Sequence, residues 1–203
     1  MKRFGIVAAA VMLALGGCGT MQGQPGGGWV KLVDASGFAG MNQIGNANWR
    51  VADGAVVSDK GVGFLVTPQQ YVDFELRAEF YAESDTNSGI FIRCNDRVKI
   101  TSETCYEVNI WDVRPKPEYG TGAMVDVPGA AVTPQMPKAG GKWNTYVVTA
   151  KGDHFTVTLN GVKTVDVRNA KHAKGAIGLQ RAPGVKKEAE TPIKWRKVQI
   201  RAL

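Results

Sequence analysis

The sequence holds few of the residues on which several enzyme classes depend. Among 203 residues there are 3 cysteines and 2 histidines. There is no Cys-x-x-Cys or His-x-x-x-His pair, no Gly-x-Ser-x-Gly motif and no phosphate-binding loop. Structural zinc sites, dithiol redox centres, nucleophile-elbow hydrolases and nucleotide-binding loops depend on such motifs. The sequence therefore gives no support to any of these classes.

A basic stripe interleaved with aromatic residues is also missing. The formal net charge is +7, but the lysines and arginines are scattered along the chain. Because a nucleic-acid surface gathers its positive charge on one face, we expect no nucleic-acid partner. Segments with helical periodicity are few as well, which disfavours a fold of alternating strands and helices.

The first residues predict export and a lipid anchor. Two charged residues, 2–3, precede an apolar run, 4–15, that is too short to span a bilayer as a mature helix. Residues 15–18, Leu-Gly-Gly-Cys, resemble the lipobox of bacterial lipoproteins, which implies acylation of Cys18. An ordinary signal peptide cleaved nearby is the alternative. Gly19, where an inner-membrane retention signal has Asp, points to the outer membrane of a Gram-negative cell envelope.

We divide the chain into three parts. Residues 1–17 form the lipoprotein signal peptide, and residues 18–28, with Pro25 and three successive glycines, form a lipidated flexible tether. Residues 29–203 form a single domain that is long enough to bury its own core. We expect this domain at the periplasmic face or the surface of the outer membrane, with the lipid as its membrane contact.

Short segments typical of β-strands follow one another through this domain. In residues 73–80 the apolar residues, at even positions, alternate with charged ones and should point inward. Asp53-Gly54 and Asn160-Gly161 are strong signals for two-residue hairpins. The predicted strands span residues 49–51, 55–58, 63–67, 73–80, 87–93, 106–112, 143–150, 154–159, 162–167, 176–180 and 194–200. This pattern predicts an all-β fold, an antiparallel β-sandwich or jelly roll.

A long segment, 114–141, interrupts the series of strands. It is too rich in proline and glycine for a central strand and too long for a simple connection. We interpret it as a candidate binding loop, because Tyr119, Met124 and Val125 give it apolar residues that a solvated linker lacks. A disordered excursion is the alternative.

Polar residues gather in two consecutive predicted strands, the fifth and the sixth. Strict alternation places their apolar residues on one face. The other face then carries Arg93, Glu107, Asn109 and Trp111. A guanidinium, an acid, an amide and an indole together suit a sugar. A cross-strand ion pair is the alternative for Arg93 and Glu107, and Trp111 could instead belong to the core.

The cysteines of the folded domain, Cys94 and Cys105, predict a structural disulfide, since the compartment outside the inner membrane is oxidising. Strict alternation, however, puts Cys94 on the face of Ile92 and Cys105 on the face of Glu107. A β-bulge or a strand end must therefore intervene if the two cysteines pair.

A series of short motifs runs in a fixed order through the domain. The motifs are Trp49-Arg50-Val51-Ala52-Asp53-Gly54, Leu65-Val66-Thr67, Asp73-Phe74-Glu75-Leu76, Asn87-Ser88-Gly89-Ile90-Phe91-Ile92-Arg93, Tyr106-Glu107-Val108, Trp143-Asn144, Leu159-Asn160-Gly161 and Gly178-Leu179-Gln180. Together they resemble the 3-keto-disaccharide hydrolase domain family over nearly all of residues 29–203. The resemblance implies a concanavalin-like or laminin-G-like β-sandwich and cleavage of glycosides whose sugar is oxidised at C3. Asn109 stands where the family usually has Gln, and Trp111 where an aliphatic residue is common.

Cleavage of such a glycoside can be written as an elimination. The C3 ketone acidifies the hydrogen on C2, so a base removes this proton and the aglycone leaves C1; water then adds to the enone. We assign Glu107 as the base and Asp112 as the acid or its supporting partner. Arg93 is assigned as the group that stabilises the enolate oxygen.

Amides and an indole complete the predicted site. Asn87, Asn109 and Gln180 would bind hydroxyl groups, and Trp111 would stack on the sugar ring. Asn87 could instead serve the turn before Gly89, and Gln180, at a strand end, could take either role.

The sequence requires no cofactor, although Glu107, Asn109 and Asp112 offer oxygen ligands that suit a divalent metal ion. His154, in a hairpin, and His172, among lysines, are interpreted as solvated. Two further functions stay open beside the hydrolase. The domain could be a non-catalytic carbohydrate-binding module, or a scaffold lipoprotein of the envelope.

Overall fold

The computed structural model describes residues 27–132, 137–186 and 191–203. The predicted signal peptide, Cys18 and most of the predicted tether lie outside these residues. No helix in the described ranges is long and apolar enough to cross a membrane. The elements are β1 (Val30–Val33), β2 (Asn42–Gly45), β3 (Arg50–Ala52), β4 (Ala55–Ser58), β5 (Gly63–Val66), β6 (Phe74–Ala82), β7 (Ser88–Cys94), β8 (Tyr106–Ile110), the 3-10 helix η1 (Pro117–Tyr119), β9 (Lys142–Lys151), β10 (His154–Leu159), β11 (Val162–Arg168), β12 (Ala176–Arg181) and β13 (Ile193–Ala202).

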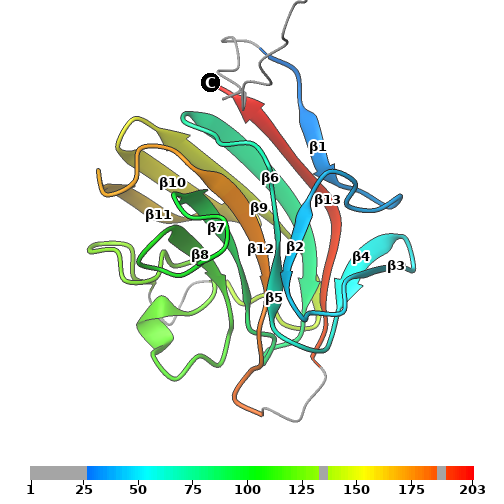
Figure 1. Cartoon of the computed structure of the whole chain (residues 1–203). Helices are drawn as coiled ribbons and strands as arrows, with labels where there is room; N and C mark the ends of the chain where they lie inside the picture. The colour runs from blue at the N-terminus through cyan, green and yellow to red at the C-terminus, as the bar shows by residue number, and fades with distance from the viewer. Residues whose placement is uncertain (1–26, 133–136, 187–190) are drawn as a thin grey trace, which may run out of the picture.

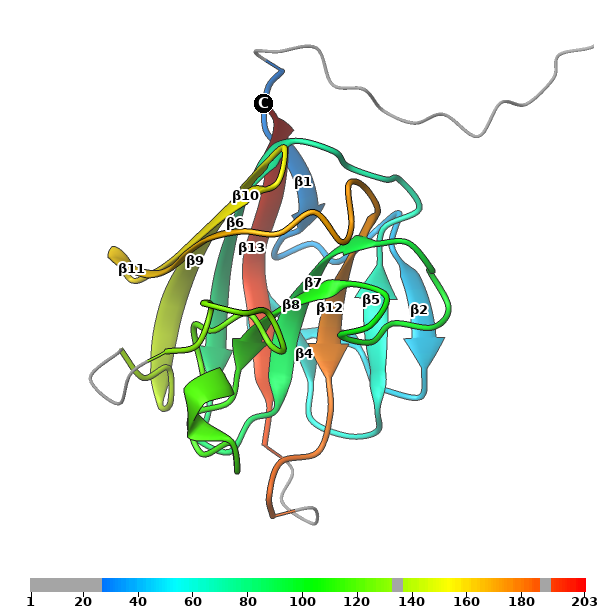
Figure 2. The same ribbon diagram turned by 90° about the vertical axis from the view of Figure 1, so that its left-hand side faces the viewer.

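The strands form two antiparallel sheets that stack face to face (Figure 1). The eight-stranded sheet has the order β11-β10-β9-β6-β13-β4-β3, with β1 also paired to β13. The five-stranded sheet has the order β2-β5-β12-β7-β8, and Figure 2 shows these strands side by side in one layer. The predicted all-β sandwich is therefore confirmed.

Alternation along the strands builds the core between the sheets. In β6, Phe74, Leu76, Ala78 and Phe80 are completely buried, as predicted. Charged residues between them point to the other side, where Glu75 and Glu79 form ion pairs with arginines of β13. The five-stranded sheet contributes to the same core Leu65, Ile90, Ile92, Val108, Ile177 and Leu179.

Both predicted two-residue hairpins are present. In the β3–β4 turn, φ is 51° at Asp53 and 71° at Gly54, and in the β10–β11 turn it is 50° at Asn160 and 85° at Gly161. Two successive positive φ angles are typical of the type I′ turn, whose twist matches that of the paired strands. The Asn160 side chain also accepts the N–H of Thr145 at 2.8 Å, which ties the turn to β9.

Strands β1 and β2 have no counterpart among the predicted strands. Each spans four residues; β2 is largely exposed, and β1 buries only Leu32 and Val33. In β2 the apolar residue is Ile44 alone, so there is no alternation to detect. Pairing with β13 and β5 respectively, which the local sequence does not reveal, makes these segments extended.

A β-bulge in β7 decides which face each cysteine occupies. Between the pairs Ala176–Cys94 and Gly178–Phe91, β7 holds one more residue than β12. The extra residue turns Cys94 away from the core, and Cys94 forms a disulfide with Cys105. The predicted disulfide and the predicted bulge are both confirmed.

The described part of segment 114–141 packs along the free edge of β8. Val125 donates its N–H to the carbonyl oxygen of Glu107 at 2.9 Å, and Met124 forms a bridge with Val108. Met124 and Val125 are buried. A disordered excursion is therefore wrong for these described residues, and a role in ligand binding stays a prediction.

The two histidines differ in environment. His154 is partly exposed, and its Nε2 lies 2.7 Å from a carboxylate oxygen of Asp166. His172 is only 5 % exposed and packs edge-on against the ring of Tyr106. Burial lowers the pKa of His172. The prediction that His172 is solvated is wrong, because the sheet folds Tyr106 over it despite its lysine neighbours.

Candidate active site

Glu107 and Asn109 lie on the face of the five-stranded sheet that is turned away from the core, which we term the outer face. Their neighbours in β8, Tyr106, Val108 and Ile110, all belong to the core. Since successive side chains of a strand point to opposite faces, the two polar side chains point outward. The sequence prediction for these two residues is confirmed in this respect.

Cross-strand pairing gathers three polar residues around a glycine. Glu107 pairs with Phe91, and Asn109 pairs with Gly89, the next outward position of β7. Gln180 lies opposite Gly89 from the other side, in the register that the flanking pairs of β12 and β7 set. Glu107, Asn109 and Gln180 therefore approach one another across three adjacent strands.

The absence of a side chain at Gly89 leaves room for the Glu107 carboxylate. A Cβ atom at residue 89 would lie 3.4 Å from Oε1 of Glu107 and 3.0 Å from the carbonyl oxygen of Val108. Any larger side chain at this position would displace the carboxylate. Gly89 thus lets Glu107 lean over the centre of the outer face.

Glu107 is the most perturbed carboxyl group on this face. Glu107 is only 7 % exposed, and its carboxylate accepts no hydrogen bond from the described residues. Burial raises the pKa of Glu107 to about 7; nearby Arg114 lowers this pKa and Asp126 raises it. A carboxyl group with such a pKa can both take and return a proton near neutral pH.

Two side-chain amides beside Glu107 have oxygens without a partner among the described residues. Asn109 is fully buried, and its Nδ2 donates to the carbonyl oxygen of Tyr119 at 2.6 Å, while its Oδ1 is unpaired. Oε1 of Gln180 is also buried and unpaired. Buried polar atoms ordinarily have partners, so two unpaired amide oxygens beside a carboxylate are typical of a ligand site. Asn87 at the edge of this group donates to the carbonyl oxygen of Pro183 at 2.8 Å.

Trp111 is held at the margin of the outer face by Asp85. The indole Nε1 donates to Asp85 Oδ1 at 3.0 Å, and the same carboxylate accepts the N–H groups of Val185 and Lys186. The guanidinium carbon of Arg114 lies 5.7 Å from the centroid of the Trp111 ring. Trp111 is half-buried, so it is neither a core residue nor a freely exposed platform.

Arg93 does not lie where alternation predicts. It is 1 % exposed and stacks on Phe155 on the core side of the sheet. Its guanidinium donates to the carbonyl oxygens of Val72, Gly152 and His172. The bulge, at which Arg93 has φ of 51°, rotates the side chain to the opposite face from Glu107. Both the enolate-stabilising role and the ion pair with Glu107 are therefore wrong for Arg93.

Asp112 serves as a structural acceptor. Its Oδ1 accepts the hydroxyl of Thr121 at 2.6 Å, and its Oδ2 accepts the N–H of Gly140 at 2.8 Å and that of Ala139 at 3.0 Å. Three protein donors already occupy the oxygens of this carboxylate, so the assignment as an acid does not fit the geometry. The described ranges hold no group of three or more His, Cys, Asp or Glu side chains that could bind a metal ion.

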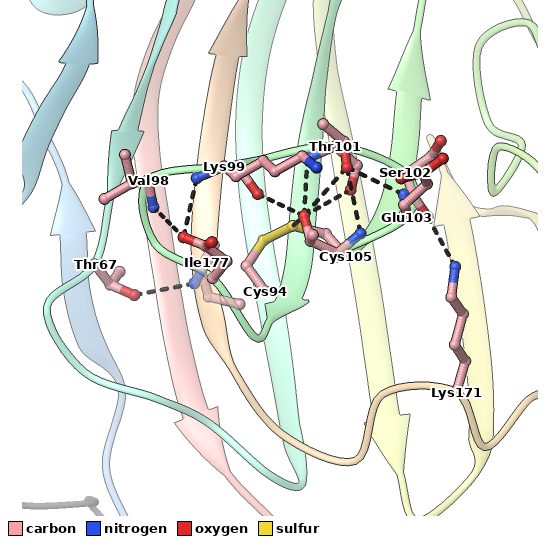
Figure 3. The surroundings of a disulfide bond; sticks show 12 residues. Thr67, Cys94, Val98, Lys99, Thr101, Ser102, Glu103, Cys105, Lys171 and Ile177 are labelled. Atoms are coloured by element: carbon pink, nitrogen blue, oxygen red, sulfur yellow. Dashed lines mark hydrogen bonds between the residues drawn. A yellow bond between two sulfur atoms is a disulfide. The ribbon is translucent and has the colours of Figure 1, made fainter.

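The rest of the outer face is apolar and carries the disulfide. Figure 3 shows Cys94 and Cys105 joining the ends of a loop in which Thr101 lies close to Cys105, with Lys171 reaching the carbonyl oxygen of Ser102. A cluster under this loop comprises Val66, Phe91, Cys94, Ile100, Cys105 and Ala176, with Ile44 and Phe64 packed against it. This cluster occupies one end of the outer face, and the polar residues around Gly89 occupy the other end.

Three residues of this site are missing from the sequence prediction. Gly89 belongs to one of the motifs given above, and a glycine inside a strand often marks a place where another group comes close to the backbone. Arg114 lies just after the predicted sixth strand, but a charged residue in a Pro-rich segment carries no specific signal. Asp85 had no local signal, because its partners come from residues 111 and 185–186.

The fold and the family match together define a carbohydrate-active β-sandwich domain. Residues 28–201 match the family described as the 3-keto-alpha-glucoside-1,2-lyase-like domain. The chain belongs to this family, which confirms the resemblance found in its motifs. No curated protein matches the chain by sequence.

Solved structures with the same fold include two from Parabacteroides distasonis that are assigned as glycosyl hydrolases. The first is 25% identical, with a TM-score of 0.69, and the match covers 87% of this chain and 100% of that chain. The second is 18% identical, with a TM-score of 0.70 and coverage of 87% and 94%. Carbohydrate-binding module CBM66 from Bacillus subtilis is 14% identical, with a TM-score of 0.55 and coverage of 80% and 96%. Identities below 25% bear on the fold alone.

Proposed function

We propose that this protein cleaves the glycosidic bond of glycosides whose sugar carries a ketone at C3, with Glu107 as the base. The observation that carries the proposal is a buried carboxylate, with a pKa of about 7 and no hydrogen bond from the described residues, beside two unpaired amide oxygens. The family match supports this substrate class.

The reaction is a two-step exchange of a proton and a leaving group. Glu107 takes the proton from C2, the electron pair forms the C1–C2 double bond, and the aglycone leaves C1 with its oxygen. Water then adds its oxygen to C1 of the enone and a proton to C2, which completes net hydrolysis. The ketone makes the first step feasible because the charge of the carbanion is shared with the C3 oxygen.

Glu107 also suits the return of the proton. After the first step its carboxyl group is neutral, and a neutral carboxyl is stable in a buried, poorly solvated position. The same group can therefore protonate the departing oxygen, while water supplies the proton that C2 later receives. This removes the need for Asp112 as a separate acid.

The amides and the indole supply binding in this proposal. The side-chain oxygens of Asn109 and Gln180 have no partner among the described residues, so they can accept hydrogen bonds from sugar hydroxyls. Trp111, fixed by Asp85 and half-buried, would offer a sugar ring only the part of its indole that stays exposed beside Arg114. Asn87 lies at the edge of the group, and its Nδ2 already donates to the carbonyl oxygen of Pro183.

The proposal is tested with Glu107→Gln in product release from a 3-keto-glucoside. We expect activity to fall at least 1000-fold while the sugar still binds, because Gln keeps the size of Glu but cannot take the proton. Glu103→Gln is the matched control, since Glu103 is exposed in the nearby disulfide loop. Assays with and without a chelator report any need for a divalent metal ion. Full activity of Glu107→Gln would overturn the proposal.

Two other results would select the rival functions. Saturable binding of a glycan, with no cleavage of any keto-glycoside by folded protein, would identify a carbohydrate-binding module. An absence of both binding and cleavage would favour an envelope scaffold. In either case the Glu107→Gln variant would behave like the parent protein.

A further inference from the structure

The elimination proposed above needs a positive group near the C3 oxygen. Negative charge develops on this oxygen as the C2 proton leaves, and a donor aimed at such a charge is among the largest contributions to enzymatic rates. Arg93 cannot supply it, because its guanidinium lies on the core side of the sheet. Arg181 in β12 is engaged with the carbonyl oxygens of Gly61 and Asp59.

The geometry points to Arg114 as the catalytic cation that binds the C3 oxygen, with Trp111 as the positioning residue that holds it beside Glu107. This inference rests on the proposed function and extends it to a residue outside every family motif quoted above. Arg114 follows β8 by four residues and is half-buried. Its guanidinium makes no hydrogen bond or ion pair with the described residues, so its donors are free for a ligand.

The support for Arg114 extends through Trp111 to Asp85. The guanidinium lies over the indole ring, the indole N–H donates to Asp85, and Asp85 is fixed by two backbone N–H groups. When a guanidinium stacks on an aromatic ring, the N–H groups at its edge remain free to donate hydrogen bonds to an oxygen atom of a ligand. The chain of contacts thus holds a cation in place without using up its donors.

Arg114 also acts on Glu107 electrostatically. The charged groups that act on the Glu107 carboxyl are Arg114, after β8, and Asp126, in the segment along the β8 edge. Strands β7 and β12 present Gly89, Phe91 and Gln180 to this carboxyl group, and none of these titrates. Arg114 follows the strand that carries Glu107, and it favours the ionised form of this carboxyl, which supports a role for both groups on one ligand.

The test compares Arg114→Gln and Arg114→Lys with Arg196→Gln. Arg196 lies over Trp143 on the other sheet, 4.3 Å from the ring centroid, so it is a matched arginine–tryptophan pair far from the site. We expect Arg114→Gln to lose at least 100-fold in kcat/KM for the 3-keto-glucoside. Arg114→Lys should retain an intermediate rate, and Arg196→Gln should match the parent protein.

The pH profile separates catalysis from a merely structural effect. Glu107 must be ionised to act, and loss of Arg114 raises its pKa, so the acid limb of kcat/KM should move to higher pH in Arg114→Gln. Asp126→Asn should move the same limb to lower pH, because it removes a charge that raises the pKa. In Arg114→Lys the limb should stay near that of the parent protein.

The outcomes distinguish the two proposals. Cleavage by the parent protein together with unchanged kcat/KM and pH profile in folded Arg114→Gln would overturn the role of Arg114 and leave the proposed function standing. The role of Arg114 would also be overturned if Arg114→Gln and Arg114→Lys lost kcat/KM equally and the acid limb of the pH profile moved in neither variant. No cleavage by folded parent protein would remove the proposed function, and with it this inference.

Discussion

At the scale of single residues, Glu107 carries the largest electrostatic consequence. Its pKa is about 7 in the folded protein, against an ordinary value of 4.5. The folded state therefore holds this proton more tightly than the unfolded chain does. The associated stabilisation is complete below pH 4.5 and is lost as the pH rises through 7, because an ionised carboxylate is costly in this buried position.

We expect Glu107→Gln to remove this pH dependence. Relative to the parent protein, the free energy of unfolding of the variant should rise by roughly 3 kcal/mol between pH 4.5 and pH 8, since one pKa unit corresponds to about 1.4 kcal/mol. Urea denaturation at several pH values measures this difference, with Glu103→Gln as the control. A constant difference across the range would mean that Glu107 is not perturbed.

Arg93 is expected to matter for stability rather than for catalysis. Arg93→Met leaves the carbonyl oxygens of Val72 and Gly152 without their donor, so we expect a loss of about 3 kcal/mol in the free energy of unfolding. The kcat/KM of the folded variant should stay near that of the parent protein. Normal stability with abolished cleavage would instead place Arg93 in the reaction.

At the scale of elements, the disulfide loop borders the site. Cys105 precedes Glu107 by two residues in the same outward alternation, so the bridge fixes the start of β8. We expect the double variant Cys94→Ser, Cys105→Ser to lose about 3 kcal/mol in the free energy of unfolding, from the entropy of the released loop. Denaturation of oxidised parent protein, reduced parent protein and the double variant measures it. Equal stability of all three would contradict a structural role for the bridge.

The predictability of elements from sequence depended on whether local pattern or tertiary pairing decides them. β6 could be predicted because residues 74–80 alternate between buried apolar and charged side chains, and the hairpin turns because Asp53-Gly54 and Asn160-Gly161 favour positive φ. β2 could not, since its sequence has little alternation and its extended form depends on β5.

The same distinction explains the partial success at the site. Alternation in β8 correctly placed Glu107 and Asn109 on one face. It failed for Arg93 because a single extra residue in β7 reverses the face, and the sequence indicated only that a bulge was needed for the cysteines to pair. Arg114 and Asp85 reach the site through loops, whose course depends on the whole fold.

At the scale of the whole molecule, we propose that the domain is tethered to the cell envelope through Cys18. Residues 1–26 lie outside the described structure, so the proposal rests on the lipobox-like sequence. We expect the full chain, expressed in a Gram-negative host, to incorporate labelled palmitate and to partition into detergent. Cys18→Ala should abolish both. Unlabelled, water-soluble parent protein would support an ordinary signal peptide instead.

The measurement that tests the central claim most directly is product release by the 29–203 domain from a 3-keto-glucoside and from its unoxidised parent glucoside, in deuterated water. Elimination followed by addition of water predicts cleavage of the keto substrate alone, with deuterium at C2 of the released sugar beyond that in a product-only control. Cleavage of both substrates, or of the keto substrate with its original C2 hydrogen retained, would contradict the account.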